Sequence, residues 1–334
     1  MRPGESREGR WLRRLAAEGI APSAEGLDGA RLVALARRHR LSALAGSLLA
    51  AGGSAPSFAA ELVSDWRRAI GEQALAARAL EEVAERFRAR GVSALTFKGG
   101  DVGRRLYGPG ERPSNDIDLL VAEDRLDDAL AALAEAGFRT DASGFARQRR
   151  RWFSAAFRSV PCPRLLIDLH WRLGPSWRAR WNEADVAARS EASPGLPAGI
   201  RRMADADVAA HLALHAVAFH GASGRWIWWL DIRRLWATSP DAAAAWRARA
   251  AEVGGLVAFD AARLRCARLF GPLAGAETLP APGVRARLAA AHGAFWEDRA
   301  GDKLARWPVA ALVVDRPLGM VAAIGRALSR PLRG

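Results

Sequence analysis

The first ninety residues alternate apolar and polar positions with the period of amphipathic helices. The segment from Asp28 to Gly53 has this spacing and ends in glycines, which often close helices. A stretch rich in glycine, serine and proline follows it, and a second, longer segment runs from Phe58 to Arg90. Apolar residues of this longer segment recur at i, i+3 and i+7, namely Leu80, Val83 and Phe87. The pattern predicts an N-terminal helical region over residues 1–90.

After residue 90 the apolar positions gather into short continuous runs, which are typical of buried strands. The first run, Val92–Phe97, leads into Gly99 and Gly100, and this suits a strand that ends in a tight turn. Three further strands are predicted over Asp116–Val121, Arg151–Phe157 and Arg164–Trp171. Between them, Glu123–Ala136 has the spacing of a helix.

From about Asp205 the helical period returns. Three tryptophans recur here at helical spacing, which favours a role in helix packing over a platform for stacking nucleic-acid bases: Trp226, Trp229 and Trp236. We therefore predict an α+β fold with a small core between two helical regions. The expected parts are an N-terminal helical region over 1–90, an α/β core over 91–175 and a C-terminal helical domain over 176–334.

The chain carries a formal charge of +14, which suggests a polyanionic partner such as a nucleotide, a nucleic acid or an acidic membrane. All but two of its 50 basic residues are arginine, the exceptions being Lys98 and Lys303. A GC-rich coding bias explains such an excess of arginine as well. The charge alone therefore does not select a partner.

Several classes of protein do not fit the sequence. The N-terminus lacks the apolar segment of a signal peptide, and no stretch approaches 18 uncharged apolar residues. Cys162 and Cys266 have no partner in a Cys-x-x-Cys motif, so a zinc site built on cysteine is not expected. We expect a cytoplasmic protein that does not bind a membrane.

Two carboxylates begin the predicted strand at DIDLLV. Side chains alternate along a strand, so Asp116 and Asp118 share one face while Ile117 points into the core. Adjacent carboxylates repel each other unless a cation lies between them, and Mg²⁺ prefers oxygen ligands. A solvated turn is the alternative, but unpaired charges at the start of an apolar strand are costly. The pair therefore indicates a metal site.

A third carboxylate, Asp168, lies between Ile167 and Leu169 in another apolar strand. If this strand pairs with the one that carries Asp116 and Asp118, the three carboxylates converge. Three such groups can hold two metal ions about 4 Å apart, which stabilise the attacking and leaving oxygens of a phosphoryl displacement. The acid nearest the attacking hydroxyl can also accept its proton.

The turn before these acids has the features of a phosphate site. Gly99 and Gly100 allow the backbone to approach a phosphate closely, and the following helix would present free N–H groups. Lys98 supplies a compact ammonium in a chain that otherwise uses arginine. Arg112 and Ser114 are close enough in sequence to Asp116 to bind the same phosphates. Chance is the alternative for Lys98, since Lys303 has no evident role.

Histidines are the remaining candidates. His170 lies two residues after Asp168 and shares its face, so it could contact substrate or metal or be a structural imidazole. His211 and His215 lie at i and i+4 on a predicted helix, with His220 near its end, and no His-Glu-x-x-His motif supports zinc. We expect His215 and His220 to border the site from the helical domain as possible substrate contacts.

Taken together, these residues resemble the uncharacterised nucleotidyltransferase family, which belongs to the superfamily with a DNA polymerase β-like core. The resemblance covers residues 30 to 300 and rests on GVSALTFKG, LYG, RPSNDIDLLV, EAGF and IDLHWRL in that order, followed by WWLDI. It implies a small mixed β-sheet core flanked by helical regions. It also implies that Asp116, Asp118 and Asp168 bind metal and that the turn at Gly99 and Gly100 holds a triphosphate.

The resemblance further implies an enzyme that transfers a nucleoside monophosphate from an NTP, ATP among them, with release of pyrophosphate. The cofactor would be Mg²⁺ or Mn²⁺, and the acceptor would be a small molecule, a peptide or protein, or an RNA end. The turn reads Lys-Gly-Gly where the superfamily usually has Gly-Ser, and this is closer to bacterial nucleotidyltransferase-like toxins. Two alternatives therefore stay open: a non-catalytic nucleotide- or nucleic-acid-binding module, and a toxin that modifies tRNA.

Overall fold

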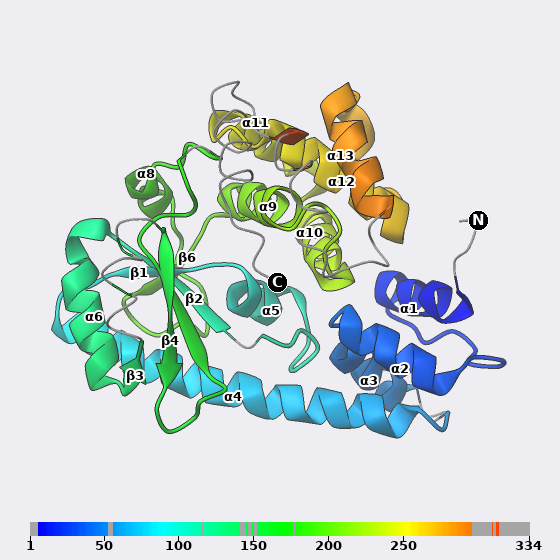
Figure 1. The fold of residues 1–334 in the computed structure, drawn as a ribbon, viewed down its shortest axis with the longest axis horizontal. Helices are drawn as coiled ribbons and strands as arrows, with labels where there is room; N and C mark the ends of the chain where they lie inside the picture. Colours follow the sequence, from blue (N-terminus) through cyan, green and yellow to red (C-terminus); the bar gives the residue numbers. More distant parts are fainter. Residues whose placement is uncertain are drawn as a thin grey trace, which may run out of the picture.

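A computed structural model describes residues 6–52, 56–114, 116–140, 145, 149, 152–176, 178–295, 309 and 312–313. The fold is α+β, as predicted, with a small mixed sheet and helices on both sides of it in sequence. In Figure 1 the sheet lies at one end of the molecule, helices α1 to α3 lie at the other, and α9 to α13 lie above and between them.

The N-terminal region contains four helices: α1 (Arg7–Glu18), α2 (Gly29–Arg38), α3 (Ser42–Ala51) and α4 (Ala59–Ala89). The segment with helical spacing over Asp28–Gly53 contains two helices, because the chain turns between α2 and α3. Arg40 adopts a left-handed conformation there (φ 57°), and the Leu41 N–H donates to the Ala36 carbonyl at 2.8 Å, which closes α2. Since Arg40 is not a glycine, the pattern gave no signal for this end.

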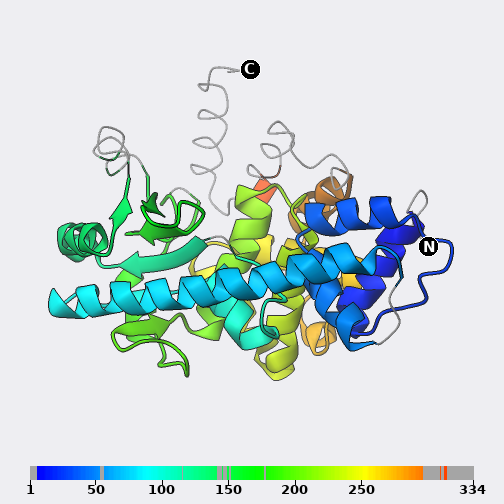
Figure 2. The same cartoon turned by 90° about the horizontal axis from the view of Figure 1, so that it is seen from below.

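Helix α4 links both ends of the molecule, and the helix predicted over Phe58–Arg90 is confirmed (Figures 1 and 2). Its first turns pack on α3, and its last turns lie under the sheet, where Leu80, Val83 and Phe87 are buried as predicted. The middle of α4 supports the loop that follows α5. There the Trp66 indole donates to the Pro109 carbonyl at 2.8 Å.

The sheet has the strand order β3-β4-β5-β2-β1-β6. The strands are β1 (Ala94–Thr96), β2 (Asp116–Val121), β3 (Phe138–Arg139), β4 (Ser154–Ser159), β5 (Leu166–His170) and β6 (Ile200–Arg202). The pairs β2–β5 and β1–β6 are parallel and the others antiparallel, so the sheet is mixed.

The four predicted strands are confirmed as β1, β2, β4 and β5. Strand β4 begins at Ser154, later than predicted, and Arg151, where that strand was expected to begin, lies outside the described residues. The pattern missed β3 and β6, which have two and three residues and are too short for alternation to reveal.

The two faces of the sheet border different cores. On one face, Ile117, Leu119 and Val121 pack with α4 and with α6 (Leu126–Glu135), which follows the short helix η1 (Glu123–Arg125) as predicted for this segment. On the other face, Leu95, Phe97 and Leu120 join a core that includes both the N-terminal and the C-terminal helices. The candidate acids lie on this second face.

The remaining helices are α5 (Gly99–Leu106), α8 (Glu183–Ala188), α9 (Asp205–Leu214), the π-helical turn η2 (His215–Phe219), α10 (Trp226–Thr238), η3 (Pro240–Ala242), α11 (Ala243–Glu252), α12 (Leu256–Phe270), η4 (Ala276–Thr278) and α13 (Val284–Phe295). Trp226, Trp229 and Trp236 are buried, so their predicted role in helix packing is confirmed. In the part of the chain that the structure describes, every helix is too short or too polar to span a bilayer. The division into three parts at residues 90 and 175 stays a prediction.

Candidate active site

The parallel pairing of β2 with β5 brings the candidate acids together. Asp118 lies directly opposite Asp168, and Leu120 lies opposite His170. Because alternate residues of a strand share a face, Asp116 and Asp118 lie on the same face as Asp168 and His170. The strand pairing on which the predicted convergence depended is therefore present.

Three of these side chains form a compact group. Asp118, Asp168 and His170 each offer one atom, and these atoms lie within 4.8 Å of one another. The His170 Nε2 atom lies 3.0 Å from Asp168 Oδ2 and 3.3 Å from Asp118 Oδ1. Two carboxylates and an imidazole at this spacing suit a divalent cation. An imidazole ligand favours Mn²⁺ over Mg²⁺. We call these three residues the acid cluster.

Asp116 lies at the solvent-accessible start of β2, outside the acid cluster. Its Oδ1 accepts a hydrogen bond of 3.0 Å from the Ser114 hydroxyl, which also donates to the Asp116 carbonyl. Ser114 thus fixes the orientation of this carboxylate. The predicted role of Asp116 as a metal ligand stays a prediction.

A lysine neutralises the acid cluster. The Lys98 ammonium donates to Asp118 Oδ1 at 2.8 Å and lies 3.4 Å from His170 Nε2. The Lys98 side chain is only 16% exposed. Two adjacent carboxylates require a nearby cation, and in the described residues Lys98 supplies one.

The charges around the acid cluster keep its carboxylates ionised. Burial alone would raise the pKa of Asp118, but the Lys98 ammonium and the His170 hydrogen bond outweigh it and lower that pKa. Burial also opposes ionisation of Asp168, yet His170 and then Lys98 hold the pKa of Asp168 well below its ordinary value. At Asp116 the surrounding protein desolvates the carboxylate, and with the Asp118 charge this raises the pKa. Asp116 is therefore the acid whose charge is least compensated.

Lys98 stands at a strained position of the backbone. It precedes α5 with φ 57° and ψ −136°, a conformation that side-chain-bearing residues rarely adopt. This conformation turns the chain sharply from β1 into α5. Strain of this kind gathers at functional sites, where the surrounding structure enforces it.

The two glycines of the turn have different surroundings. A Cβ atom at Gly99 would lie 2.5 Å from Arg112 Nη1 and 2.7 Å from Ser114 Oγ, whereas a Cβ atom at Gly100 would meet nothing within 4 Å. Gly99 is therefore needed for the close approach of Arg112 and Ser114. Gly100 faces open space at the N-terminal end of α5, where free N–H groups can bind an anion.

Arg112 is held by an acid from the C-terminal region. Its Nη2 donates to Asp231 Oδ2 at 2.7 Å and its Nε to Asp231 Oδ1 at 3.0 Å. The Tyr107 hydroxyl also donates to Asp231 Oδ1, at 2.8 Å. These bonds use Nε and Nη2, so Nη1 is the nitrogen that lies beside Gly99 and Ser114. Asp231 thereby orients Arg112 toward the glycine turn.

The sequence-based interpretation missed two residues of this region, Asp231 and Arg40. Asp231 lies in WWLDI, an acid among apolar residues, which is the same signal that singled out Asp168. Half-buried Arg40 forms no ion pair with any residue that the structure describes, and burial and the nearby Arg225 guanidinium lower its pKa while Asp116 opposes this effect. No sequence signal marked Arg40, because its place depends on the turn between α2 and α3.

His170 belongs to the acid cluster, and ring contacts through Phe97 connect it to the histidines of the helical domain. The Phe97 ring is edge-on to both His170 and His211, with centroid distances of 5.0 Å in each case. His211 and His215 are 6.3 Å apart, and His215 and His220 are 4.6 Å apart. The expectation that His215 and His220 border the site is compatible with this arrangement, while their contact with substrate stays a prediction.

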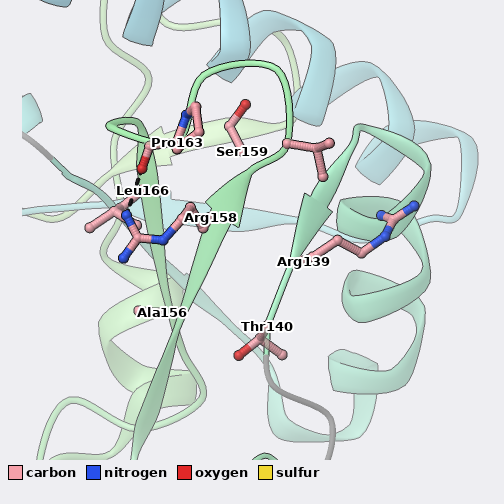
Figure 3. Close-up of a pocket in the computed structure, with 8 residues that line it drawn as sticks. Arg139, Thr140, Ala156, Arg158, Ser159, Pro163 and Leu166 are labelled. Atoms are coloured by element: carbon pink, nitrogen blue, oxygen red, sulfur yellow. Dashed lines mark hydrogen bonds between the residues drawn. The ribbon is translucent and has the colours of Figure 1, made fainter.

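A separate hollow of about 480 Å³ lies at the β3–β4 side of the sheet (Figure 3). It is lined by Arg139, Thr140, Ala156, Arg158, Ser159, Val160, Pro163 and Leu166. None of the candidate site residues lines this hollow, and the Arg158 guanidinium is bound to the Pro163 carbonyl at 2.6 Å. It is not the site formed by the acid cluster.

Comparison with known protein families identifies the family of this chain. A family model described as an uncharacterised nucleotidyltransferase matches residues 25–271, which is most of the chain. No curated protein matches. The matched range includes the acid cluster, the glycine turn and Asp231.

Proposed function

Because this chain belongs to the uncharacterised nucleotidyltransferase family, we propose that it transfers a nucleoside monophosphate from an NTP to an acceptor and releases pyrophosphate. The observation that carries the proposal is the placement of Asp118 opposite Asp168 on paired strands, with Asp116 at the open side and the glycine turn next to them. The proposed setting is the cytoplasm, where NTPs and Mg²⁺ are both abundant.

Asp118 and Asp168 would hold the divalent cation, Mg²⁺ or Mn²⁺, and Asp116 would complete its ligands from the solvent side. When bound, such a cation neutralises the charge that develops on the phosphate oxygens during the displacement. Asp168 would also activate the acceptor hydroxyl, since a carboxylate beside the cation can take its proton. His170 would orient both carboxylates through its contacts of 3.0 Å and 3.3 Å.

The triphosphate would lie over the glycine turn. The free N–H groups at the start of α5 would bind its oxygens, and so would Arg112 and Ser114, whose Nη1 and hydroxyl lie beside Gly99. Arg40, from the N-terminal region, would also bind the triphosphate, because an anion stabilises the charge of a half-buried guanidinium that lies among other cations. Lys98 would shift from Asp118 toward a phosphate when the cation binds.

The proposal has three forms, which differ in the acceptor. The acceptor is a small molecule, a peptide or protein, or an RNA end, and the last of these includes the tRNA of the toxin alternative. To test them, we would incubate the full chain with each α-labelled NTP, Mg²⁺ and a cell extract, and then separate RNA, protein and small molecules. Label should enter one fraction and should be lost in Asp118→Asn. Absence of pyrophosphate release with every NTP would overturn the enzymatic proposal.

One observation favours a second candidate, a nucleotide-binding module that no longer transfers. Lys98 already caps Asp118, and a permanent cap would exclude the cation. The two candidates differ in binding of Mn²⁺ to the protein without nucleotide or with a non-hydrolysable NTP analogue. Tight binding of Mn²⁺ with the analogue supports the enzyme, whereas nucleotide binding that ignores Mn²⁺ supports the module.

A further inference from the structure

Five half-buried rings lie together between the sheet and the C-terminal helices. We call them the ring wall: Phe153, His215, Phe219, His220 and Trp228. The His220 ring is 4.3 Å from the Trp228 ring and 4.6 Å from the His215 ring. Phe219 continues the row, 6.3 Å from His215 and 5.9 Å from Phe153.

The ring wall begins at the acid cluster. The Phe153 ring lies 6.1 Å from the His170 ring, with 30° between their planes. Phe153 directly precedes β4, and His170 ends β5, which pairs with β4. A single ligand can therefore contact Asp168 with one part and the ring wall with another.

The backbone is shaped around these rings. A Cβ atom at Gly224 would lie 2.2 Å from the Trp228 ring, and one at Gly174 would lie 3.3 Å from the Phe219 ring. The π-helical turn η2 inserts an extra residue into the helix and carries His215 and Phe219. Such turns are frequent at functional sites. The tryptophans that only fill the core, such as Trp229, are fully buried, whereas Trp228 is not.

Charge around the ring wall suits a planar neutral group joined to an anion. Burial, and then the neighbouring His220, lower the pKa of His215 well below its ordinary value, which disfavours a charge on this ring. Two guanidiniums lie over the ring wall: Arg178 is 4.6 Å from the Phe219 centroid and Arg225 is 5.9 Å from the Trp228 centroid. Aromatic faces with nearby arginines bind nucleic-acid bases by stacking, whichever base is present.

We propose that the ring wall binds the base of the NTP while the acid cluster and the glycine turn hold its phosphates. This inference rests on the proposed function and adds to it the place and the mode of base recognition. Stacking on a single aromatic side chain predicts that loss of the Trp228 ring weakens NTP binding about 10- to 100-fold. The ring of an acceptor is the competing occupant, and the experiment below separates the two.

The experiment measures binding of each NTP and of inorganic tripolyphosphate to the full chain by calorimetry, with Mg²⁺ present. In Trp228→Ala, NTP affinity should fall by that factor while tripolyphosphate affinity stays the same. Trp228→Phe should keep most of the affinity, because it keeps a ring. Trp236→Phe, a buried tryptophan of the same helix, is the matched control and should change neither affinity. His215→Ala provides a second variant of the ring wall, with thermal unfolding as the check on folding.

The outcomes are distinct. Equal affinities of the wild type and Trp228→Ala for every NTP, or equal losses for NTP and tripolyphosphate, would overturn the ring-wall proposal and leave the proposed function standing. Unchanged NTP affinity in Trp228→Ala together with reduced transfer of label from the NTP to the cell extract would assign the ring wall to the acceptor and also overturn the proposal. Wild-type protein that binds neither NTP nor tripolyphosphate would overturn the proposed function and this inference with it.

Discussion

The guanidinium of Arg112 and the carboxylate of Asp231 form a buried, bidentate ion pair that joins the sheet region to helix α10. The carboxylate is completely inaccessible and the arginine side chain is 8% exposed. The pair determines which nitrogen of Arg112 faces the glycine turn. It therefore connects the packing of the C-terminal helices to the geometry of the candidate phosphate site.

Removing one partner of this pair should be far more damaging than removing both. Asp231→Asn leaves the Arg112 charge buried without its carboxylate, so we expect a loss of about 3–5 kcal/mol in the free energy of unfolding. The double variant Arg112→Met/Asp231→Leu should recover much of that loss, because neither charge then remains. Urea unfolding of Arg112→Met, Asp231→Leu and the double variant measures this coupling. Additive effects of the single changes would contradict it.

Lys98 allows backbone strain to be separated from charge. Both Lys98→Ala and Lys98→Gly remove the ammonium from Asp118, but only glycine adopts φ 57° without strain. Lys98→Gly should therefore be more stable than Lys98→Ala by about 1–2 kcal/mol. Thermal and urea unfolding compare the pair directly. If the two variants are equally stable, the positive φ does not store strain at this position.

The adjacent glycines of the turn provide a matched pair. Gly99→Ala places a methyl group against the Arg112 guanidinium and Ser114, and buried Arg112 cannot move away easily. We expect Gly99→Ala to weaken tripolyphosphate binding by at least tenfold and to destabilise the protein by about 1–3 kcal/mol. Gly100→Ala meets open space and should be close to wild type in stability. A reversed order of the two variants in calorimetry and unfolding would refute the assignment.

The acid cluster predicts an order of effects on cation binding. Asp118 and Asp168 lie within the group that spans 4.8 Å, whereas Asp116 lies at its open side. Asp118→Asn and Asp168→Asn should weaken Mn²⁺ binding more than Asp116→Asn does in the absence of nucleotide, since loss of a central carboxylate removes more of the charge at the cation. Electron paramagnetic resonance of free Mn²⁺ gives the three affinities. Equal losses would place Asp116 among the central ligands.

Stability should fall in mild acid partly because of His211. Burial, and then the charges of Lys98 and His170, lower the pKa of His211 well below its ordinary value of 6.5, and in the described residues its ring nitrogens have no hydrogen-bond partner. Below pH 6.5 the unfolded chain binds a proton at His211 and the folded protein does not. The contribution of neutral His211 to the free energy of unfolding is therefore fully present above pH 6.5 and declines as the pH falls below it. Unfolding of His211→Phe between pH 8 and pH 5 should show a smaller decline. An unchanged decline would show that other groups cause it.

The sequence predicted the parts of the site that depend on strand alternation. Asp118 and Asp168 were recognisable because each is an acid inside an apolar strand, and the parallel pairing of β2 with β5 aligns them. The pairing of Arg112 with Asp231 was not predictable, because it joins residues 119 positions apart through the packing of α10. Arg40 was missed for a similar reason, since a left-handed arginine between two helices leaves no periodic signal.

Helix α4 belongs to both cores at once, with Leu62 in the core shared by the helical regions and Phe87 in the core beneath the sheet. Between them, Trp66 holds the loop that leads to Arg112. A chain shortened to begin at residue 91 would lose one wall of the sheet together with this support. The sheet and the helices should therefore melt in a single transition, and the smallest piece of this chain that keeps the site is one that keeps α4 whole.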